Sequence, residues 1–193
     1  LFIVLEERDG GCIFAGIDYE EISSDYEKYL FRTGSSRGAN FSPTAKITSL
    51  KNTYDQKILG WFRTVLKDKN IKNKEKFEKM YELLSDKQEE IMQLLSQKIE
   101  LMEKALLSIK VNNAYPIDNQ LFTEAFLYLI NKKDFEVSST NQVCSICHQH
   151  KPTVIGKMSV FKFYTLDKPG FITGGFYEEN AWKNYPVCDI IEA

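Results

Sequence analysis

The sequence of 193 residues lacks most of the motifs by which enzymes are recognised. It contains no nucleophile elbow, Walker loop, glycine-rich dinucleotide turn or zinc-protease motif, and its only histidines are His148 and His150. The adjacent carboxylates Glu89–Glu90 and Glu178–Glu179 point to different faces of a helix, so neither pair can act as a catalytic dyad. These absences favour a binding protein over an enzyme, and a hydrolase with dispersed acidic ligands is the alternative.

Long apolar runs are also absent. No stretch of 18 apolar residues occurs, so we expect no membrane-spanning helix. The chain starts with Leu1 rather than Met, and its first residues lack the basic region and the cleavage site of a signal peptide. We therefore expect a segment of a longer cytoplasmic protein. With 43% hydrophobic residues the chain can build a core, which argues against wholesale disorder.

Cysteine is scarce, but the placement of the four cysteines is informative. Cys144 and Cys147 are separated by two residues, which is the spacing of a zinc knuckle, and Cys188 is a natural third ligand. Cys12 lies far from them in the sequence. In a reducing compartment such a close pair is usually metal-binding or redox-active. The sequence therefore favours a structural Zn²⁺ ion held near the C-terminal end.

The fourth zinc ligand is less obvious, because Ile191 stands where a second Cys-x-x-Cys pair would place it. A histidine can fill this position, and His148 is the less favourable choice because it directly follows a ligand. The predicted ligand set is Cys144, Cys147, Cys188 and His150. The alternatives are buried thiols without metal and a thioredoxin-type redox pair, whose usual βαβ setting the sequence lacks.

The net charge of −2 conceals an uneven distribution of charge along the chain. Residues 1–27 carry one basic and eight acidic residues, whereas residues 28–63 carry seven basic residues and one acidic residue. A basic block within a nearly neutral chain is the electrostatic footprint expected of a nucleic-acid site. The alternative is that the acidic and basic blocks pair with each other within the fold.

Hydrophobic periodicity predicts an α+β fold with a mainly helical middle and short β elements. Two apolar segments flank a Gly-Gly turn within residues 1–17, which predicts a β-hairpin. Apolar residues at helical spacing predict helices after Thr53 and over residues 75–110. Ser85-Asp-Lys-Gln88 fits a capping box, so a helix is expected to restart there. A further helix is predicted over residues 121–130, with Asp118 or Asn119 as its cap.

The C-terminal third has a different character. Residues 158–165 have the composition of a strand, and residues 178–184 can form a short helix. We therefore predict two domains. Residues 1–140 form an α+β domain with long helices, and residues 141–193 form a cysteine-knuckle module with a strand and a short helix.

Lysine and aromatic residues alternate in Phe161-Lys-Phe-Tyr-Thr-Leu-Asp-Lys-Pro-Gly-Phe171. On a strand, Lys162 and Tyr164 share one face, which can contact phosphates and bases while the other face packs. The alternative is a simple amphipathic strand. The predicted nucleic-acid-binding residues are the cations of this stretch, of the glycine-rich loop region and of the last segment: Arg32, Arg37, Lys46, Lys162, Lys168 and Lys183.

Several ordered segments carry a resemblance to a known family. They are Lys28-Tyr-Leu-Phe-Arg32, Ser42-Pro-Thr-Ala-Lys-Ile-Thr48, Asn52-Thr-Tyr-Asp-Gln-Lys-Ile-Leu-Gly-Trp-Phe62, the Phe161–Phe171 stretch and Ala181-Trp-Lys-Asn-Tyr-Pro-Val-Cys188. Together they are similar to the N-terminal part of the large subunit of type I-B CRISPR interference complexes, known as Cascade. The family's zinc-type pattern is Cys-x-x-Cys twice, from which Ile191 departs.

The resemblance implies a non-catalytic subunit of an RNA-guided complex that serves antiviral defence. In such a complex, pairing with the guide reads the target sequence and a protein subunit reads the short adjacent motif. The implied partners are the CRISPR guide RNA, target DNA, the other Cascade subunits and the helicase-nuclease recruited on target binding. No membrane is among them. A metal-dependent nuclease and a purely structural zinc-knuckle scaffold are the alternatives.

Overall fold

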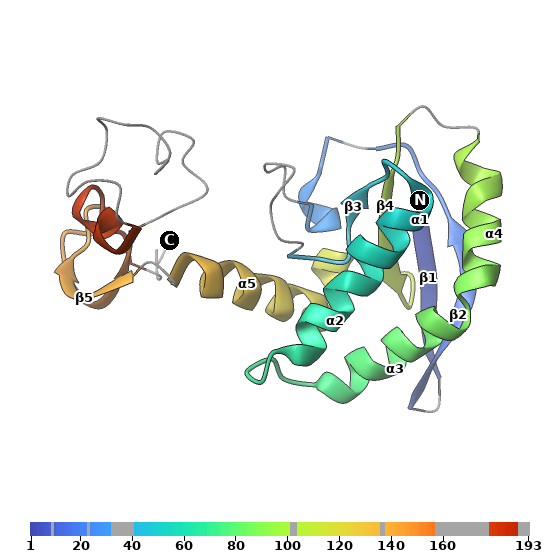
Figure 1. Ribbon diagram of the computed structural model, residues 1–193, viewed down its shortest axis with the longest axis horizontal. Coiled ribbons are helices and arrows are strands. Elements are labelled where there is room, and N and C mark those ends of the chain that lie inside the picture. The colour runs from blue at the N-terminus through green and yellow to red at the C-terminus, as the bar shows by residue number, and fades with distance from the viewer. Residues whose placement is uncertain are drawn as a thin grey trace. The chain divides into compact units, whose positions relative to one another are not determined.

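The structure, a computed structural model, has the α+β fold expected from the sequence (Figure 1). A cluster of cysteines lies near its C-terminal end. The chain divides into two compact units, Leu1–Leu127 and Tyr128–Ala193. The predicted domain boundary, between residues 140 and 141, falls inside the second unit. The structure describes residues 1–8, 10–22, 24–31, 41–100, 104–135, 138–156 and 178–188.

The first unit contains a four-stranded sheet with the strand order β2-β1-β4-β3 (Figure 1). Strands β1 (Phe2–Arg8) and β2 (Gly11–Asp18) form the antiparallel hairpin that the sequence predicts. Strand β4 (Leu106–Val111) pairs in parallel with β1 and antiparallel with β3 (Ala45–Lys46). At the hairpin tip Gly10 has a φ of 76°, a conformation that glycine adopts without steric cost.

Strand β4 corrects the prediction of one helical stripe extending to about residue 110. Helix ends at Ile99, and Leu106–Val111 is a strand whose residues are nearly all buried. In this strand Leu107, Ile109 and Val111 alternate with two polar residues. The polar side chains are buried as well, because Ser108 bonds to Thr44 and Lys110 pairs with Asp18. This alternation has the two-residue period of a strand, so the helical prediction carried the stripe of the preceding helix across a change of period.

One long helical segment follows β3 in the chain. It consists of α1 (Leu50–Asn52), the π-helical turn η2 (Thr53–Ile58) and α2 (Leu59–Lys67). It therefore begins before Thr53, where the sequence pattern predicts its start. Arg63 Nη2 donates a hydrogen bond of 2.6 Å to the carbonyl oxygen of Asp55, a residue within the π-helical turn. This bond reinforces the junction between η2 and α2.

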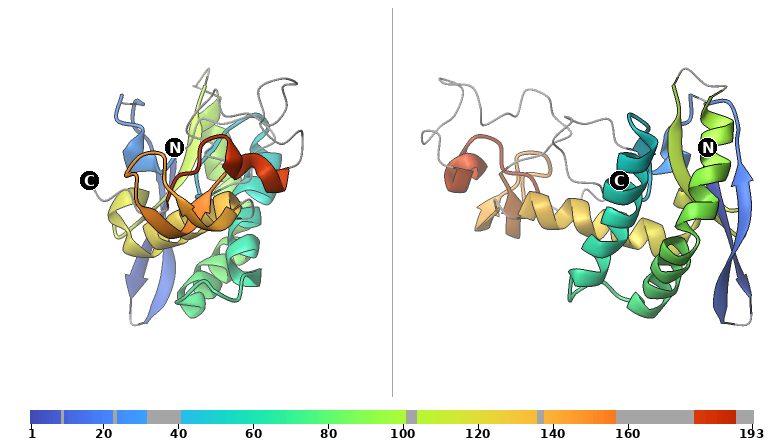
Figure 2. Two further views of the ribbon diagram at one scale, coloured as in Figure 1. Left: turned by 90° about the vertical axis from the view of Figure 1, so that its left-hand side faces the viewer. Right: turned by 45° about the vertical axis from the view of Figure 1, so that its right-hand side comes forward.

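Helices α3 (Lys74–Asp86) and α4 (Gln88–Ile99) both contact β2, and Figure 2 shows α3 beside the hairpin. The predicted restart at Gln88 is confirmed, but the capping box is not formed. Ser85 Oγ instead donates a hydrogen bond of 2.8 Å to the carbonyl oxygen of Tyr81, one turn earlier in its own helix. In the described part of the chain, no helix combines the length and apolarity needed to cross a membrane.

Four aromatic rings form the centre of the first unit's core. Trp61 of α2 lies with its ring centroid 5.7 Å from Phe77 of α3 and 5.6 Å from Phe122 of α5 (Gln120–Phe135). Phe62 packs against Trp61 at 5.0 Å, and all four side chains are fully buried. The three contacts of Trp61 are edge-to-face, the arrangement that the ring quadrupoles favour. The core thus joins helices that are distant in sequence.

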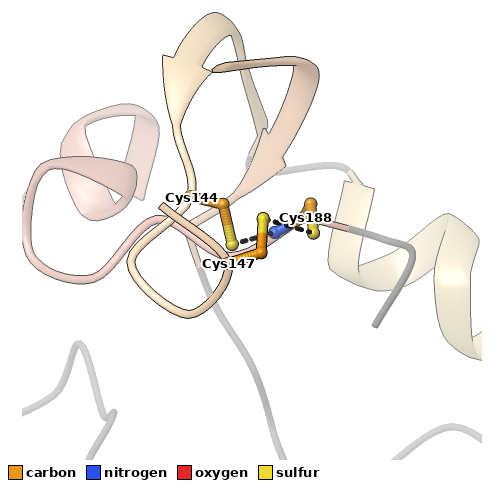
Figure 3. Close-up of side chains that lie close together, drawn as sticks. All are labelled: Cys144, Cys147 and Cys188. Atoms are coloured by element: carbon orange, nitrogen blue, oxygen red, sulfur yellow. Dashed lines mark hydrogen bonds between the residues drawn. The ribbon is translucent and has the colours of Figure 1, made fainter. Parts of the chain in front are cut away.

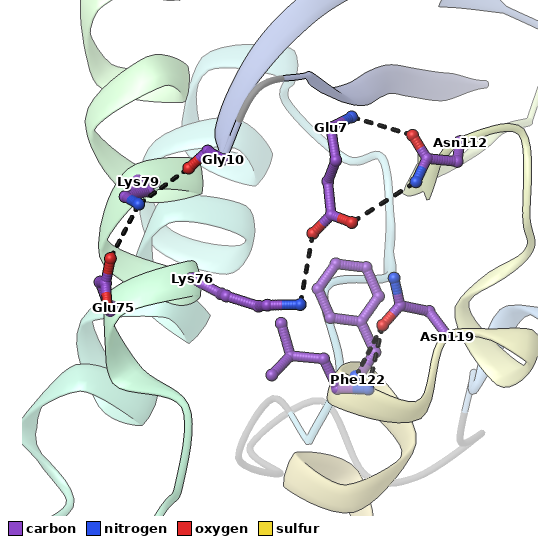
Figure 4. Close-up of polar contacts among 9 residues, drawn as sticks. Glu7, Gly10, Glu75, Lys76, Lys79, Asn112, Asn119 and Phe122 are labelled. Carbon is purple, nitrogen blue, oxygen red and sulfur yellow. Dashed lines mark hydrogen bonds and ion pairs between the residues drawn. The ribbon is translucent and has the colours of Figure 1, made fainter.

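Polar contacts fasten the hairpin to neighbouring elements and cap α5 (Figure 4). Lys79 Nζ of α3 donates a hydrogen bond of 2.8 Å to the carbonyl oxygen of Gly10. The Glu7 N–H donates to Asn112 Oδ1, just after β4, at 2.9 Å. Asn119 Oδ1 accepts the N–H of Leu121 at 3.0 Å, which confirms Asn119 as the cap of α5.

The second unit contains a hairpin that the sequence analysis did not predict. Strands β5 (Ser138–Val143) and β6 (His150–Ile155) pair antiparallel. The polar sequence of β5 lacks the apolar alternation by which strands are recognised. The short helix η4 (Glu178–Lys183) occurs where predicted. The strand predicted over residues 158–165 lies outside the described residues.

Candidate functional site

Three cysteines converge in the second unit, and their side chains are drawn in Figure 3. Cys144 follows β5, and Cys147 lies in the turn that leads to β6. Cys188 lies in the segment that follows η4, directly after Val187. The three Sγ atoms all lie within 4.8 Å of one another. Cys144 and Cys188 are buried, whereas Cys147 is exposed. The convergence predicted from the sequence spacing is therefore present.

Backbone hydrogen bonds shape the turn that carries Cys144 and Cys147. The His148 N–H donates to the Cys144 carbonyl at 2.9 Å, and the Cys144 N–H donates to the Gln149 carbonyl at 2.9 Å. The backbone of His148 adopts the left-handed conformation, with a φ of 57°. The Ser145 N–H donates to the Pro186 carbonyl at 2.7 Å, which holds this turn against the segment that leads to Cys188.

That segment is also paired with the hairpin. Val187 and Ile155 exchange backbone hydrogen bonds of 2.7 and 3.2 Å. Cys188 is thereby brought to the cysteine turn although 41 residues separate it from Cys147 in the sequence. The position of all three sulfurs thus follows from backbone pairing, which makes the site preorganised.

The environment of Cys144 favours its thiolate. The Cys188 N–H and the Ile146 N–H donate to Cys144 Sγ at 3.3 and 3.4 Å. Burial opposes ionisation, but the backbone N–H groups of Cys147, Cys188 and Ile146 outweigh it and lower the pKa of the Cys144 thiol to about 6. Burial, together with hydrogen bonds to the other two sulfurs, raises the pKa of Cys188 to about 11.

The sulfur geometry fits a tetrahedral zinc ion. Zinc–sulfur bonds of about 2.3 Å place two sulfurs of a tetrahedral site roughly 3.8 Å apart. Cys147 Sγ and Cys188 Sγ are separated by 3.9 Å. A bound cation would also draw the protons from the remaining thiols, because a coordinated thiol is deprotonated. Cys144, Cys147 and Cys188 can therefore hold a metal ion as three of its ligands.

The predicted fourth ligand, His150, does not join this group. Within the described residues, the group of side chains that lie close enough together to share an ion contains the three cysteines and no histidine. His150 is exposed and pairs with Val143 at the end of the β5–β6 hairpin. His148 is exposed as well. Ligation by His150 stays a prediction.

Two of the predicted nucleic-acid-binding residues can be located, and they lie in different units. Lys46 is exposed on β3, a strand at the edge of the first unit's sheet. Lys183 is exposed at the end of η4, with Nζ 5.7 Å from the ring centroid of Trp182. The remaining four lie outside the described residues: Arg32, Arg37, Lys162 and Lys168.

Part of the basic block is engaged within the fold. Lys28 Nζ lies 2.7 Å from Glu20 Oε1, so these members of the basic and acidic blocks pair as the alternative interpretation expects. Arg63 donates a hydrogen bond to the carbonyl oxygen of Asp55. Lys51, in contrast, is exposed at the start of the long helical segment. The block is thus divided between structural cations and cations that face solvent.

A polar network centred on Glu20 was not among the features predicted from the sequence. This carboxylate accepts hydrogen bonds from the hydroxyl groups of Tyr29 at 2.7 Å and Tyr115 at 2.6 Å, besides its pair with Lys28. Partial burial opposes ionisation, but the bonds to Lys28, Tyr115 and Tyr29 outweigh it and lower the pKa of Glu20 to about 2. Sequence holds no signal for this network, because 95 residues separate Glu20 from Tyr115.

Two protein-family models match the chain, and both describe CRISPR-associated proteins. Residues 1–128 match the N-terminal domain, and residues 141–190 match the central domain, of CRISPR-associated protein TM1802. Since the matches cover well over half of the chain, it belongs to this family. A search of curated proteins found no match, and a search of solved structures found none either. The resemblance to a CRISPR-associated protein is thereby confirmed.

Proposed function

We propose that this chain is part of the non-catalytic large subunit of a type I-B Cascade complex, where it binds target DNA and its adjacent motif. The main support for this proposal is membership of a CRISPR-associated family, because the two family matches cover residues in both units. In RNA-guided complexes the guide reads the target, while protein contacts read the adjacent motif and hold the nucleic-acid backbone. The proposed partners are guide RNA, target DNA, the other Cascade subunits and the recruited helicase-nuclease, all in the cytoplasm.

Exposed cations in both units support contact with nucleic acid. Lys46 and Lys51 are exposed in the first unit, close together in sequence, and Lys183 is exposed beside the Trp182 ring in the second. Lysines bind phosphates, and an aromatic ring next to a cation can stack on an unpaired base. These side chains are the described residues that we propose as contacts.

The cysteine cluster has a structural role in this proposal. A zinc ion held by Cys144, Cys147 and Cys188 would crosslink the β5–β6 turn to the segment that follows η4. That crosslink would fix the position of η4, which carries Lys183. The ion would contribute to folding rather than to chemistry on the nucleic acid.

The first experiment is purification of the tagged full-length protein from its native cell, followed by sequencing of the bound RNA. We expect short RNAs with CRISPR repeat ends, together with other Cascade subunits. A protein that purifies alone, without such RNA, would contradict the proposed function. Incubation of the complex with DNA and Mg²⁺, without the helicase-nuclease, is expected to leave the DNA uncut.

A second experiment tests the proposed contacts within the purified complex. Reversing Lys46, Lys51 and Lys183 to glutamate should weaken target-DNA binding and lower the salt slope by about one for each lysine that contacts a phosphate. The matched control reverses three other exposed lysines: Lys69, Lys72 and Lys104. Equal effects of the two triple variants would show that the named lysines are not specific contacts.

A further inference from the structure

The segment that follows β2 exposes an acidic and apolar surface. We name it the 19–27 surface, after its exposed residues Tyr19, Glu21, Ile22, Asp25, Tyr26 and Glu27. The large apolar members are 57%, 46% and 49% exposed, in the order Tyr19, Ile22 and Tyr26. A single exposed apolar residue is ordinary, but three within eight residues are typical of an interaction site.

Both ends of this segment are fastened to the first unit. Near its start, Glu20 is held by the hydroxyl groups of Tyr29 and Tyr115 and by Lys28. Beyond its end, Thr44 Oγ1 donates a hydrogen bond of 2.7 Å to the Tyr29 carbonyl. A surface whose ends are already ordered loses less conformational entropy when a partner binds. The network around Glu20 thus anchors the backbone of the segment while its apolar side chains stay exposed to solvent.

The charge of the surface limits what can bind it. Glu21, Asp25 and Glu27 make no ion pair with another residue in the described part of the chain. Lys28, the nearest cation in sequence, is already paired with Glu20. Lys98 Nζ lies 4.9 Å from the centroid of the Tyr19 ring, so one cation stands beside the three carboxylates and the surface stays acidic. Uncompensated carboxylates repel the phosphates of RNA and DNA and attract a partner of opposite charge. The 19–27 surface is therefore complementary to a basic protein surface.

We propose that the 19–27 surface is the docking site of another protein subunit of the complex, one that presents basic side chains around an apolar contact. The inference rests on the proposed function, because the partner is a subunit of that complex. Tyrosines are enriched at the centres of protein interfaces, and charged residues at the rim select the partner. Subunits that hold RNA carry such basic surfaces.

The test uses the full-length protein in its complex, purified through a tag on a different protein subunit. Glu21→Lys, Asp25→Lys and Glu27→Lys are combined in one variant. We expect at least a tenfold loss of this protein from the purified complex. Tyr26→Ala alone should reduce its amount less, since the charges remain. The matched control reverses three exposed glutamates of α3 and α4: Glu78, Glu82 and Glu89. Circular dichroism confirms that each variant is folded.

A carbodiimide crosslink, which joins carboxylates to lysines in direct contact, identifies the neighbour. Crosslinks from Glu21, Asp25 or Glu27 to lysines of another protein subunit support the proposal, whereas crosslinks confined to a second copy of this chain overturn it. If the unaltered protein carries guide RNA and partner subunits but both triple variants are retained equally, the docking site is wrong and the proposed function stands. If the unaltered protein has neither, both proposals fail.

Discussion

In the first unit four aromatic rings meet in one core, whereas in the second unit three cysteine sulfurs meet where the described elements join. Trp61, Phe62, Phe77 and Phe122 are fully buried and come from three helices. Around the cysteines, the buried cluster consists of Cys144, Val187 and Cys188, with Tyr185 packed against it. Val154 and Ile155 of β6 are buried as well. Among the described residues this is a small apolar core, and small folds of this kind usually need a metal or a disulfide.

Because their cores differ, the two units should respond to different perturbations. Burial of apolar surface supplies the free energy of folding in the first unit, and this does not depend on a metal ion. A metal-linked unit is expected to unfold when the ion is withdrawn, because binding free energy is then folding free energy. Four experiments can test whether the two units are stabilised differently.

Removal of the metal should have the largest effect, and only on the second unit. Cys144→Ser is expected to abolish zinc binding, with loss of an apparent stabilisation of about 10 kcal/mol or more. Zinc content by mass spectrometry and amide hydrogen exchange of β5 and β6 measure the two effects. Cys12→Ser is the matched control, because Cys12 lies on β2 of the first unit. Undiminished protection of β5 and β6 in Cys144→Ser would contradict a metal-held unit.

Truncation of the aromatic core should affect the first unit alone. Phe77→Ala removes a fully buried ring that contacts Trp61 and Phe122, and should lower the free energy of unfolding by about 3–5 kcal/mol. Urea unfolding followed by circular dichroism measures this loss. Leu127→Ala, at a position that is 53% exposed, should change stability by less than about 0.5 kcal/mol. Loss of zinc from Phe77→Ala would show that the units are not independent.

Neutralising Glu20 should have a smaller, pH-dependent effect on the first unit. The pKa of Glu20 falls from its ordinary 4.5 to about 2 in the fold. Its contribution is therefore complete above pH 4.5 and is lost as the pH falls towards 2. Since the side chain is 25% exposed, we expect Glu20→Gln to cost about 1–2 kcal/mol at pH 7.

Urea unfolding at several pH values between 3 and 7 measures this dependence. The difference between Glu20→Gln and the natural protein should shrink as the pH falls below about 4.5. Glu89→Gln is the control, because Glu89 is exposed on α4 and makes no ion pair among the described residues. A pH-independent cost of Glu20→Gln would show that shape rather than charge matters at this position.

The smallest effect is expected at the cysteine turn. His148 has a φ of 57°, which glycine adopts without the steric cost that other residues incur. His148→Gly should therefore stabilise the zinc-loaded second unit by about 0.5–1 kcal/mol, measured by hydrogen exchange of its hairpin. His150→Gly, on strand β6, should destabilise it by a similar amount.

These two variants also test the fourth ligand. Loss of zinc from His150→Gly would confirm the predicted ligation by His150, whereas full zinc content in both variants would exclude the two histidines. Destabilisation of the zinc-loaded unit by His148→Gly would contradict the steric argument.

Features that depend on neighbouring residues could be predicted well. The hairpin of β1 and β2, the restart of helix at Gln88 and the cap at Asn119 follow from turn residues, spacing and side-chain chemistry. The cysteine cluster was predictable as well, because few residue types can bind zinc. The hairpin of β5 and β6 was not, since its polar first strand carries no periodic signal.

The amino-acid sequence is sufficient to predict the fold class, most of the helices and the three cysteines that meet. These depend on periodicity, capping and ligand chemistry, which act over a few residues or through rare side chains. Leu106–Val111 has the apolar–polar alternation of a strand, but its place between β1 and β3 follows from long-range pairing that no local pattern encodes. The same holds for Glu20 and Tyr115, whose contact exists only after strand pairing has brought together side chains that lie far apart in the chain.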